Sequence, residues 1–440
     1  PDKEQPDTLD EMQPLFAAVA HGCAAGLHQR ALHEVYWPRI KRKGDHYLTA
    51  KLGAFSDDLA VIAHFFARPW DRPAPGLSEA DQAVVLSWVG FRLRALGRLR
   101  EALEPMGASV EMTVKQEDWI EAAKNAGNLS ELQLTLGEVD AALASGRDGV
   151  DYADRSGDAF QRMARRTTQA DALHQAGEPQ AAAELFQAAE RMQAEDQPQY
   201  PRLYSLRGFR YCDLLLAQGR TGEALERAGE TIKIAERNKW LLDIALDQLT
   251  QARAHLQTFL PPSPIANGRS AATLPPGRGA GGRVLLKEPF AIGEGENSNE
   301  TQNPESLTTA AHWLEQAVAG LRASGVNDYL VRGLLTRAAL HRLNGDHPAA
   351  HQDLDEVWDL AEPSGMRLHL TDYHLESARL ALAEDRPDSA REHVDAARRL
   401  IEDTGYKRRL PELEALEEEV LATDEHGLQR PKKSAADERG

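Results

Sequence analysis

A glycine followed five residues later by a small residue recurs along the sequence, inside stretches whose apolar residues are three and four positions apart. The glycines are Gly97, Gly137, Gly177, Gly219 and Gly345, and Asp385 takes the equivalent place. The small residues are Ala102, Ala142, Ala182, Ala224, Ala350 and Ala390. Except between Gly219 and Gly345, successive turns are 40 or 42 residues apart. A fixed period of this length is typical of a repeat array, in which each unit packs on its neighbours.

Each unit is expected to be a helical hairpin. The glycine ends the first helix, because a left-handed conformation costs glycine little. The small residue lets the second helix approach the first closely, and the three-and-four spacing places the apolar residues on one face. A chain of 440 residues with only 6% aromatic residues fits such an array better than one compact core. The fold class that follows is all-α, a right-handed superhelical solenoid of helical hairpins.

The 126 residues between Gly219 and Gly345 break the period. Residues 261–306 within this gap are rich in Pro, Gly, Ser and Asn and have no helical period, which predicts a disordered insertion. Removing these 46 residues leaves 80, which is two periods. The missing turn would then lie near Phe259, and the small residue that follows it would be Ala310. The insertion is therefore predicted to lie within one repeat.

The period also defines the domain organisation. The predicted segments are irregular N-terminal hairpins that cap the array (1–78), repeats (79–260), the disordered insertion (261–306), further repeats (307–422) and a disordered tail (423–440).

The stretch "ADALHQAGEPQAAAELFQAAE" carries Ala170, Gly177, Ala182, Phe186 and Ala189. This pattern resembles the tetratricopeptide repeat (TPR) family, and the resemblance covers roughly residues 80–405. The 40-residue period departs from the 34 residues typical of that family. Longer repeats of this kind resemble the C-terminal sensor arrays of bacterial STAND-type signal-transduction ATPases. The resemblance implies a protein-binding array that works with an NTPase or effector module.

The sequence shows no catalytic motif. A phosphate-binding loop, G-x-x-x-x-G-K-[ST], is absent, and so is the nucleophile elbow G-x-S-x-G. Gly277, Gly279 and Gly282 spell G-x-G-x-x-G, but they lie in the low-complexity segment and are interpreted as coincidence. The pairs His347/His351 and His369/His374 are interpreted as surface histidines, so no metal site is expected. We therefore predict no enzyme activity, no cofactor and no metal.

A net charge of −18 argues against a nucleic-acid partner. The basic runs "RIKRK" (39–43) and "KRR" (407–409) are interpreted as solvated loops. Two cysteines and the lack of a long apolar run favour a cytoplasmic protein without a membrane segment. The sequence begins without Met, which leaves open both a complete chain and a piece of a longer one.

A surface therefore remains as the expected site. The first helix of each hairpin is expected to line a concave groove, where arginines on successive repeats would hold a protein or peptide partner. The stretch "YPRLYSLRGFRYCDLL" is the strongest candidate, because Tyr and Arg are frequent in binding hot spots. The predicted partner-binding residues are Arg94, Glu131, Asp171, His174, Tyr204, Arg207, Phe209, Arg210, Asp213, Arg253, Arg332, Arg342 and Arg379.

Two functions fit these expectations. The first is a sensor or scaffold of a bacterial signalling or defence system, with the partner bound in the groove. The alternative is a stand-alone adaptor that bridges two proteins without switching. An enzyme with an unrecognised site in the groove is the third and weakest hypothesis.

Overall fold

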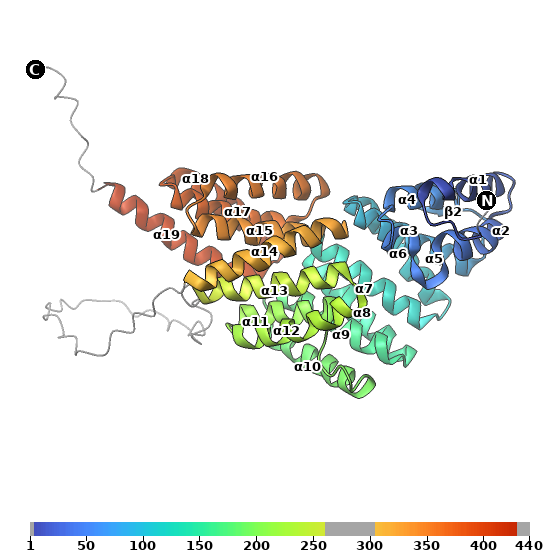
Figure 1. Cartoon of the computed structure of the whole chain (residues 1–440), viewed down its shortest axis with the longest axis horizontal. Helices are drawn as coiled ribbons and strands as arrows, with labels where there is room; N and C mark the ends of the chain where they lie inside the picture. Colours follow the sequence, from blue (N-terminus) through green and yellow to red (C-terminus); the bar gives the residue numbers. More distant parts are fainter. Residues whose placement is uncertain (1–3, 260–303, 429–440) are drawn as a thin grey trace, which may run out of the picture.

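The computed structural model describes residues 4–259 and 304–428. The predicted insertion lies outside the described residues, together with its three glycines, except that residues 304–306 begin a helix. The predicted tail also lies outside them from residue 429 onward, whereas residues 423–428 are helical. Figure 1 shows the N-terminal hairpins at one end of the molecule and α16–α19 toward the other, with α7–α13 along the lower side of the view.

An irregular unit opens the chain. Its elements are α1 (Leu9–Ala24), α2 (His28–Arg30), η1 (Ala31–Lys41), η2 (Lys43–Asp45), α3 (Tyr47–Ala50), α4 (Phe55–Ala63), β1 (Phe66–Arg68) and β2 (Arg72–Pro73). The two short strands pair antiparallel, Phe66 with Pro73, and form the one sheet among the described residues. A buried ion pair ties this unit to the array, because Arg92 Nε lies 2.7 Å from Asp58 Oδ2 and both side chains are 2% exposed.

Seven regular hairpins follow within the described part of the chain. Their first helices are α5 (Glu79–Ala95), α7 (Trp119–Leu136), α9 (Ala159–Gln175), α11 (Ser205–Ala217), α13 (Leu241–Phe259), α15 (Asn327–Leu343) and α17 (Arg367–Ala383). Their second helices are α6 (Leu99–Lys115), α8 (Val139–Ser156), α10 (Pro179–Asp196), α12 (Thr221–Asn238), α14 (Pro304–Ser324), α16 (His347–Ser364) and α18 (Pro387–Thr404). The array ends with η4 (Lys407–Arg409) and α19 (Leu410–Leu428). The predicted all-α, TPR-like solenoid of helical hairpins is confirmed.

The turn glycines have the conformation that the period predicts. The five glycines between first and second helices have φ between +72° and +83°, and Asp385 adopts the same region with φ +57°. The turns close by backbone hydrogen bonds typical of a helix C-terminus; for example, the Glu138 amide donates to the Gln133 carbonyl oxygen at 2.8 Å. The small residues that follow, Ala102 to Ala390, are at most 1% exposed. The glycine–alanine pattern is thus explained by turning and close packing.

A second set of left-handed turns, at the ends of second helices, was not predicted from the sequence. Gly157, Gly325, Gly365 and Gly405 end second helices with φ between +69° and +76°. Gly365 and Gly405 are also 40 residues apart. The hairpins α7–α8, α15–α16 and α17–α18 therefore carry two left-handed turns each, one inside the hairpin and one after it, whereas α10 ends at Gln197 with φ −130°.

Helices α13 and α14 pack on each other although residues 260–303 separate them in sequence. The Ser306 hydroxyl donates to the His255 carbonyl oxygen at 2.6 Å and lies 2.7 Å from the Thr258 hydroxyl. The end of α13 thus lies beside the start of α14, as in the other hairpins. Ala310 is 1% exposed and takes the place of the other small residues.

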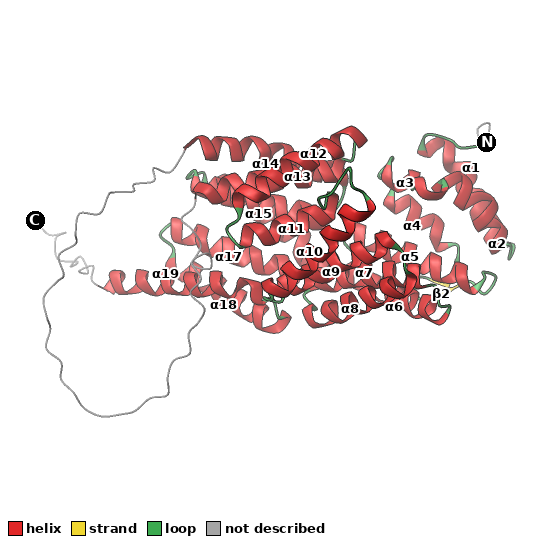
Figure 2. Cartoon of the chain, turned by 90° about the horizontal axis from the view of Figure 1, so that it is seen from below, coloured by secondary structure: helices red, strands yellow, loops and turns green. Residues whose placement is uncertain are grey.

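The array closes on itself. Helix α7 contacts α17, and η4 contacts α9, so early and late hairpins are neighbours in space (Figure 2). The turns of early and late hairpins also touch. A Cβ on Gly137 would lie 2.6 Å from Thr404 Cγ2 and 2.8 Å from Arg367 Cβ. A Cβ on Gly97 would lie 2.8 Å from Ser364 Oγ. The face lined by first helices, here called the inner face, is therefore covered by the chain's own later hairpins.

Candidate functional site

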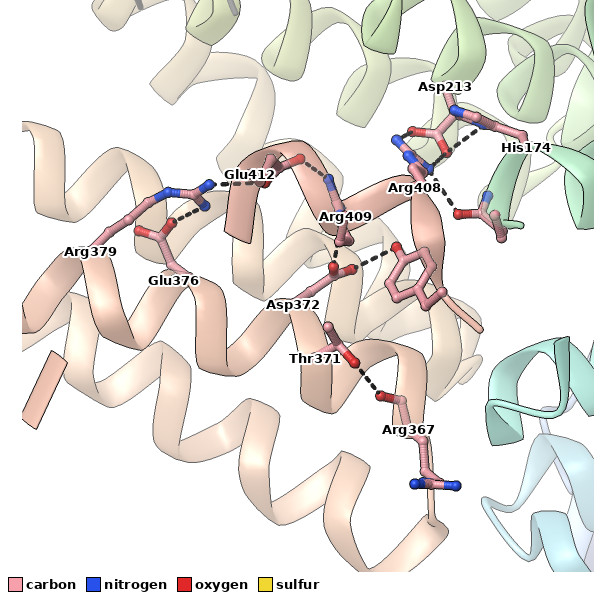
Figure 3. Close-up of polar contacts among 12 residues, drawn as sticks. His174, Asp213, Arg367, Thr371, Asp372, Glu376, Arg379, Arg408, Arg409 and Glu412 are labelled. Atoms are coloured by element: carbon pink, nitrogen blue, oxygen red, sulfur yellow. Dashed lines mark hydrogen bonds and ion pairs between the residues drawn. The ribbon is translucent and has the colours of Figure 1, made fainter. Parts of the chain in front are cut away.

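Asp213 on α11 is the centre of the polar contacts on the inner face. Its Oδ2 lies 2.6 Å from Arg408 Nη1 (Figure 3). Its Oδ1 lies 2.6 Å from Arg253 Nη2. Arg408 Nη1 also donates to Gln175 Oε1 at 3.0 Å. Burial would raise the pKa of Asp213, but Arg408 and Arg253 outweigh burial and hold that pKa well below its usual range. Arg408 thus joins η4 to α9 and α11, about 200 residues earlier.

A second group surrounds Glu131 on α7. Arg94 Nη1 lies 2.9 Å and Arg210 Nη2 lies 2.8 Å from its two carboxylate oxygens. Arg210 Nε also lies 3.3 Å from Asp171 Oδ2. Burial would raise the pKa of Glu131, yet Arg210, Arg94 and Arg165 lower that pKa to about 2. Four first helices are therefore linked by charge.

Asp328, at the start of α15, connects this group to the late hairpins. Its Oδ2 lies 3.7 Å from Arg94 Nη2, and its Oδ1 lies 2.5 Å from His369 Nε2. Burial would lower the pKa of Arg332, one turn further along α15, but Asp328, Asp213 and Asp171 raise that pKa above its usual value.

A third group extends from η4 along the last hairpin (Figure 3). Arg409 Nε lies 2.7 Å from Asp372 Oδ1, and Arg409 also pairs with Glu412. Arg379 bridges Glu412 at 2.8 Å and Glu376 at 3.4 Å. Arg342 Nε lies 2.6 Å from the other Glu376 oxygen. Because Arg408 and Arg409 are consecutive, this group continues into the contacts of Asp213.

We call the contacts that join early to late hairpins the ionic seam. It comprises Arg94, Gln175, Asp213, Asp328 and Arg408. An apolar cluster lies beside it and is made of Leu134, Val139, Ala142, Ala172, Leu368 and Tyr406. The space left at the seam is a cavity of about 20 Å³, enough for a water molecule. The inner face is therefore closed by both charge and apolar packing.

Several predicted site residues are less exposed than a groove surface would require. Phe209 is 1% exposed and packs edge-on against Tyr329 at 6.0 Å, so it belongs to the core. His174 and Asp213 are each 2% exposed. Burial and the neighbouring Arg408 lower the pKa of His174 well below its usual value, so its ring is neutral. These side chains are therefore buried against other hairpins in this structure, and partner contact by them stays a prediction.

Tyr204 and Arg207 differ from most of the other predicted residues because both lie at the N-terminal end of their helix, α11. Each is partly exposed, and the Arg207 guanidinium lies over the Tyr204 ring at 5.3 Å. Tyr204 and Asp243 stabilise the charge of Arg207, but no ion pair joins it to a residue that the structure describes, and its Nε has no hydrogen-bond partner there. Burial lowers the pKa of Arg207.

Three other interpretations of the sequence differ from the structure. The run at 407–409 is not a solvated loop throughout, because Arg408 and Arg409 are only 10% and 19% exposed and form ion pairs. In the run at 39–43, Lys41 is 5% exposed and lies over the rings of Trp37 and Trp88. His369 is likewise buried at 3% and paired with Asp328.

The sequence prediction missed Gln175, Asp328, His369, Arg408 and Arg409. Asp328 and His369 lie at the starts of first helices, beyond the positions that the repeat pattern singled out. Arg408 lies in η4, three residues after Gly405, and takes the place that Asp328 has after Gly325. The sequence did offer the adjacent arginines at 408 and 409 as an indication, because in a chain with a net charge of −18 two neighbouring cations have many carboxylates to pair with.

In residues 4–259 and 304–428, no three His, Cys, Asp or Glu side chains are grouped so that they could hold a metal ion. Over the same described residues, every helix is too short or too polar to cross a membrane. Cys23 and Cys212 are both buried and unpaired.

No protein-family model and no curated protein matches the sequence. Among solved structures, the chain is similar to a Rap protein complexed with competence and sporulation factor, at 11% identity and a TM-score of 0.35. That alignment covers 95% of this chain and 98% of the Rap chain. It is also similar to the TPR domain of P58(IPK), at 12% identity and a TM-score of 0.25, over 87% of this chain and 97% of that chain. Similarity at this level carries no inference about function.

Proposed function

We propose that this chain is a protein- or peptide-binding repeat scaffold that acts as a sensor, with its partner bound on the inner face. The observation that supports this function is the ionic seam. An arginine- and carboxylate-rich inner face is the surface a partner would use, and in this structure the chain's own η4 segment covers it. A partner that binds there competes with Arg408 for Asp213 and Gln175.

The competition gives a mechanism for sensing. A ligand shifts an equilibrium between two states only by the difference in its affinity for them. The closed array offers a cavity of about 20 Å³, too small for a peptide, so a partner on the inner face binds the open state alone. Opening separates the early hairpins from the late ones, and this movement would be transmitted to a fused or associated NTPase or effector module. The assignment to a bacterial signalling or defence system rests on the resemblance of the repeats to sensor arrays.

The alternative function is an adaptor that bridges two proteins without switching. It is favoured by the large apolar side chains that stay exposed while the array is closed, such as Phe160 at 43% and Trp240 at 41%. A protein that binds only these side chains would leave the seam shut.

Hydrogen exchange separates the two functions. The partner is first captured from the native host and identified by mass spectrometry, and the complex is then compared with the free chain. A sensor loses protection in α17 and residues 405–409 when the partner binds. An adaptor gains protection at its contact surface and changes nowhere else. Because Arg408→Ala opens the seam without a partner, that variant should bind the partner more tightly if the chain is a sensor, and with unchanged affinity if it is an adaptor.

A further inference from the structure

Large apolar side chains recur at the starts of successive first helices, outside the ionic seam. Ile120 is the second residue of α7, Phe160 the second residue of α9, and Trp240 directly precedes α13; their exposures are 45%, 43% and 41%. Tyr200, in the segment before α11, completes a spacing of 40 residues. Contiguous exposed apolar groups on a protein surface indicate an interaction site more often than isolated ones do.

Three of the hairpins join these side chains into one continuous stack. The Arg207 guanidinium lies 5.1 Å from the Phe160 ring centre and 5.3 Å from that of Tyr204. The Tyr204 ring is stacked on Trp240, with centres 6.4 Å apart and planes at 9°. Tyr200 meets Tyr204 edge-on at 6.0 Å. We call Phe160, Tyr200, Tyr204, Arg207 and Trp240 the aromatic strip.

The charge at the strip is unbalanced. Neither Arg207 nor Arg237 forms an ion pair with a residue that the structure describes, and Arg237 donates to the Tyr200 hydroxyl at 3.3 Å. Asp243 is the carboxylate that raises the pKa of Arg207, and its Oδ1 already accepts a hydrogen bond from the Ser205 hydroxyl at 2.6 Å. The α11 helix has no side-chain cap at its N-terminus, so its first amides add positive potential at the same place. A partner with carboxylates would supply the missing counter-charge.

The spacing of the strip sets the shape of that partner. Packed helices lie about 8–10 Å apart, and a segment in the extended polyproline II conformation advances about 9 Å per turn of three residues. One hairpin step therefore matches one turn of such a segment, and every third side chain points the same way. We infer that the aromatic strip binds an extended acidic segment of another protein, with a large apolar side chain at every third position and carboxylates between them. This surface is distinct from the inner face and does not depend on the sensor function.

A second copy of the chain fits the strip less well. Each copy carries a net charge of −18, so electrostatic repulsion opposes the association of two copies. A short acidic segment carries much less charge and can place it beside the two arginines.

Two fluorescein-labelled heptapeptide series test the inference on the full chain by fluorescence polarisation. Both series have Leu or Phe at positions 1, 4 and 7, and the remaining positions are Glu in one and Lys in the other. We expect the Glu series to bind about tenfold tighter than the Lys series. Phe160→Ala and Trp240→Ala should each weaken Glu-series binding about tenfold, as hot-spot residues do. Arg207→Gln should remove the preference for Glu.

Trp358→Ala is the matched control, because Trp358 on α16 is 40% exposed and lies outside the strip. Equal binding of both series, an equal loss in the Trp358 variant, or no binding at 1 mM peptide would overturn the inference. So would a dimer that the Trp240→Ala change dissociates, since the occupant would then be a second copy. Binding that appears only after residues 265–300 are deleted would also overturn it, because the chain itself would be the occupant.

Discussion

Asp247 on α13 is a carboxyl group buried with too few partners. The Thr231 hydroxyl donates to its Oδ1 at 2.9 Å, and its Oδ2 has no hydrogen-bond partner among the described residues. Burial raises the pKa of Asp247 to about 8, and Asp243 adds to that rise. The side chain is therefore protonated in the folded protein at neutral pH.

This residue gives a pH-dependent prediction. Between pH 3.8 and about 8 the folded state holds a proton that the unfolded state has released, so stability falls as the pH rises through this window. Asp247→Asn removes that loss, and we expect it to raise the free energy of unfolding by about 3–4 kcal/mol more at pH 8 than at pH 5. Urea unfolding at both pH values measures the difference. Asp359→Asn on the exposed face of α16 is the control for the substitution itself, and its unfolding is measured at the same two pH values. An equal slope in wild type and Asp247→Asn would contradict the assignment.

A turn residue can have to be glycine because its φ is positive, as at Gly345, or also because a Cβ has no room, as at Gly137. Both have positive φ, +82° and +77°, but a Cβ on Gly137 would meet Thr404 and Arg367 whereas one on Gly345 would meet nothing within 4 Å. Gly345→Ala should cost only the strain of a left-handed alanine, about 1 kcal/mol. Gly137→Ala should cost about 2–4 kcal/mol, because overpacking at the closed turns is added. Denaturant unfolding of the two variants is the measurement. Similar costs would mean that the turns of early and late hairpins do not touch.

Among the elements, η4 carries the strongest prediction. Arg408→Ala leaves Asp213 buried with Arg253 as its remaining arginine partner, and breaking a buried pair costs about 3–5 kcal/mol. We expect Arg408→Ala to destabilise the fold by about 3 kcal/mol and to raise hydrogen exchange in α9 and α11. Lys407→Ala in the same element removes the same charge from an exposed side chain and should change stability by less than about 0.5 kcal/mol. Equal effects of the two variants would show that net charge matters and that the Arg408–Asp213 contact does not.

The hairpins could be predicted from the sequence because their requirements are local. Gly137 needs a positive φ, and Ala142 must be small, whatever the rest of the chain does. The face of each first helix could also be predicted, which is why Arg94, Glu131 and Asp213 were singled out. Their partners could not be predicted in the same way. Asp213 meets Arg408 because the array curves back after almost 200 residues, and the curvature is the sum of small rotations that no single repeat encodes.

For the whole molecule, closure changes what the repeats mean for function. An open solenoid presents its inner face to a partner directly. In this array the inner face is already paired with the chain's own late hairpins, whereas the aromatic strip is exposed in the closed array. Under the two proposals, the chain would bind one partner at the strip at all times and another at the seam only after opening.

Closure itself is tested most directly by a disulfide. A Cβ on Gly97 would lie 3.9 Å from Ser364 Cβ, within the range of about 3.5–4.5 Å that a disulfide needs. The double variant Gly97→Cys with Ser364→Cys should cross-link under mild oxidation in most molecules, which non-reducing electrophoresis and peptide mass spectrometry detect. The control pair, Gly345→Cys with Ser364→Cys, places thiols at opposite ends of α16, about 27 Å apart, and should stay reduced. If the Gly97 pair stays as reduced as the control, the array is open in solution and the closed seam is contradicted.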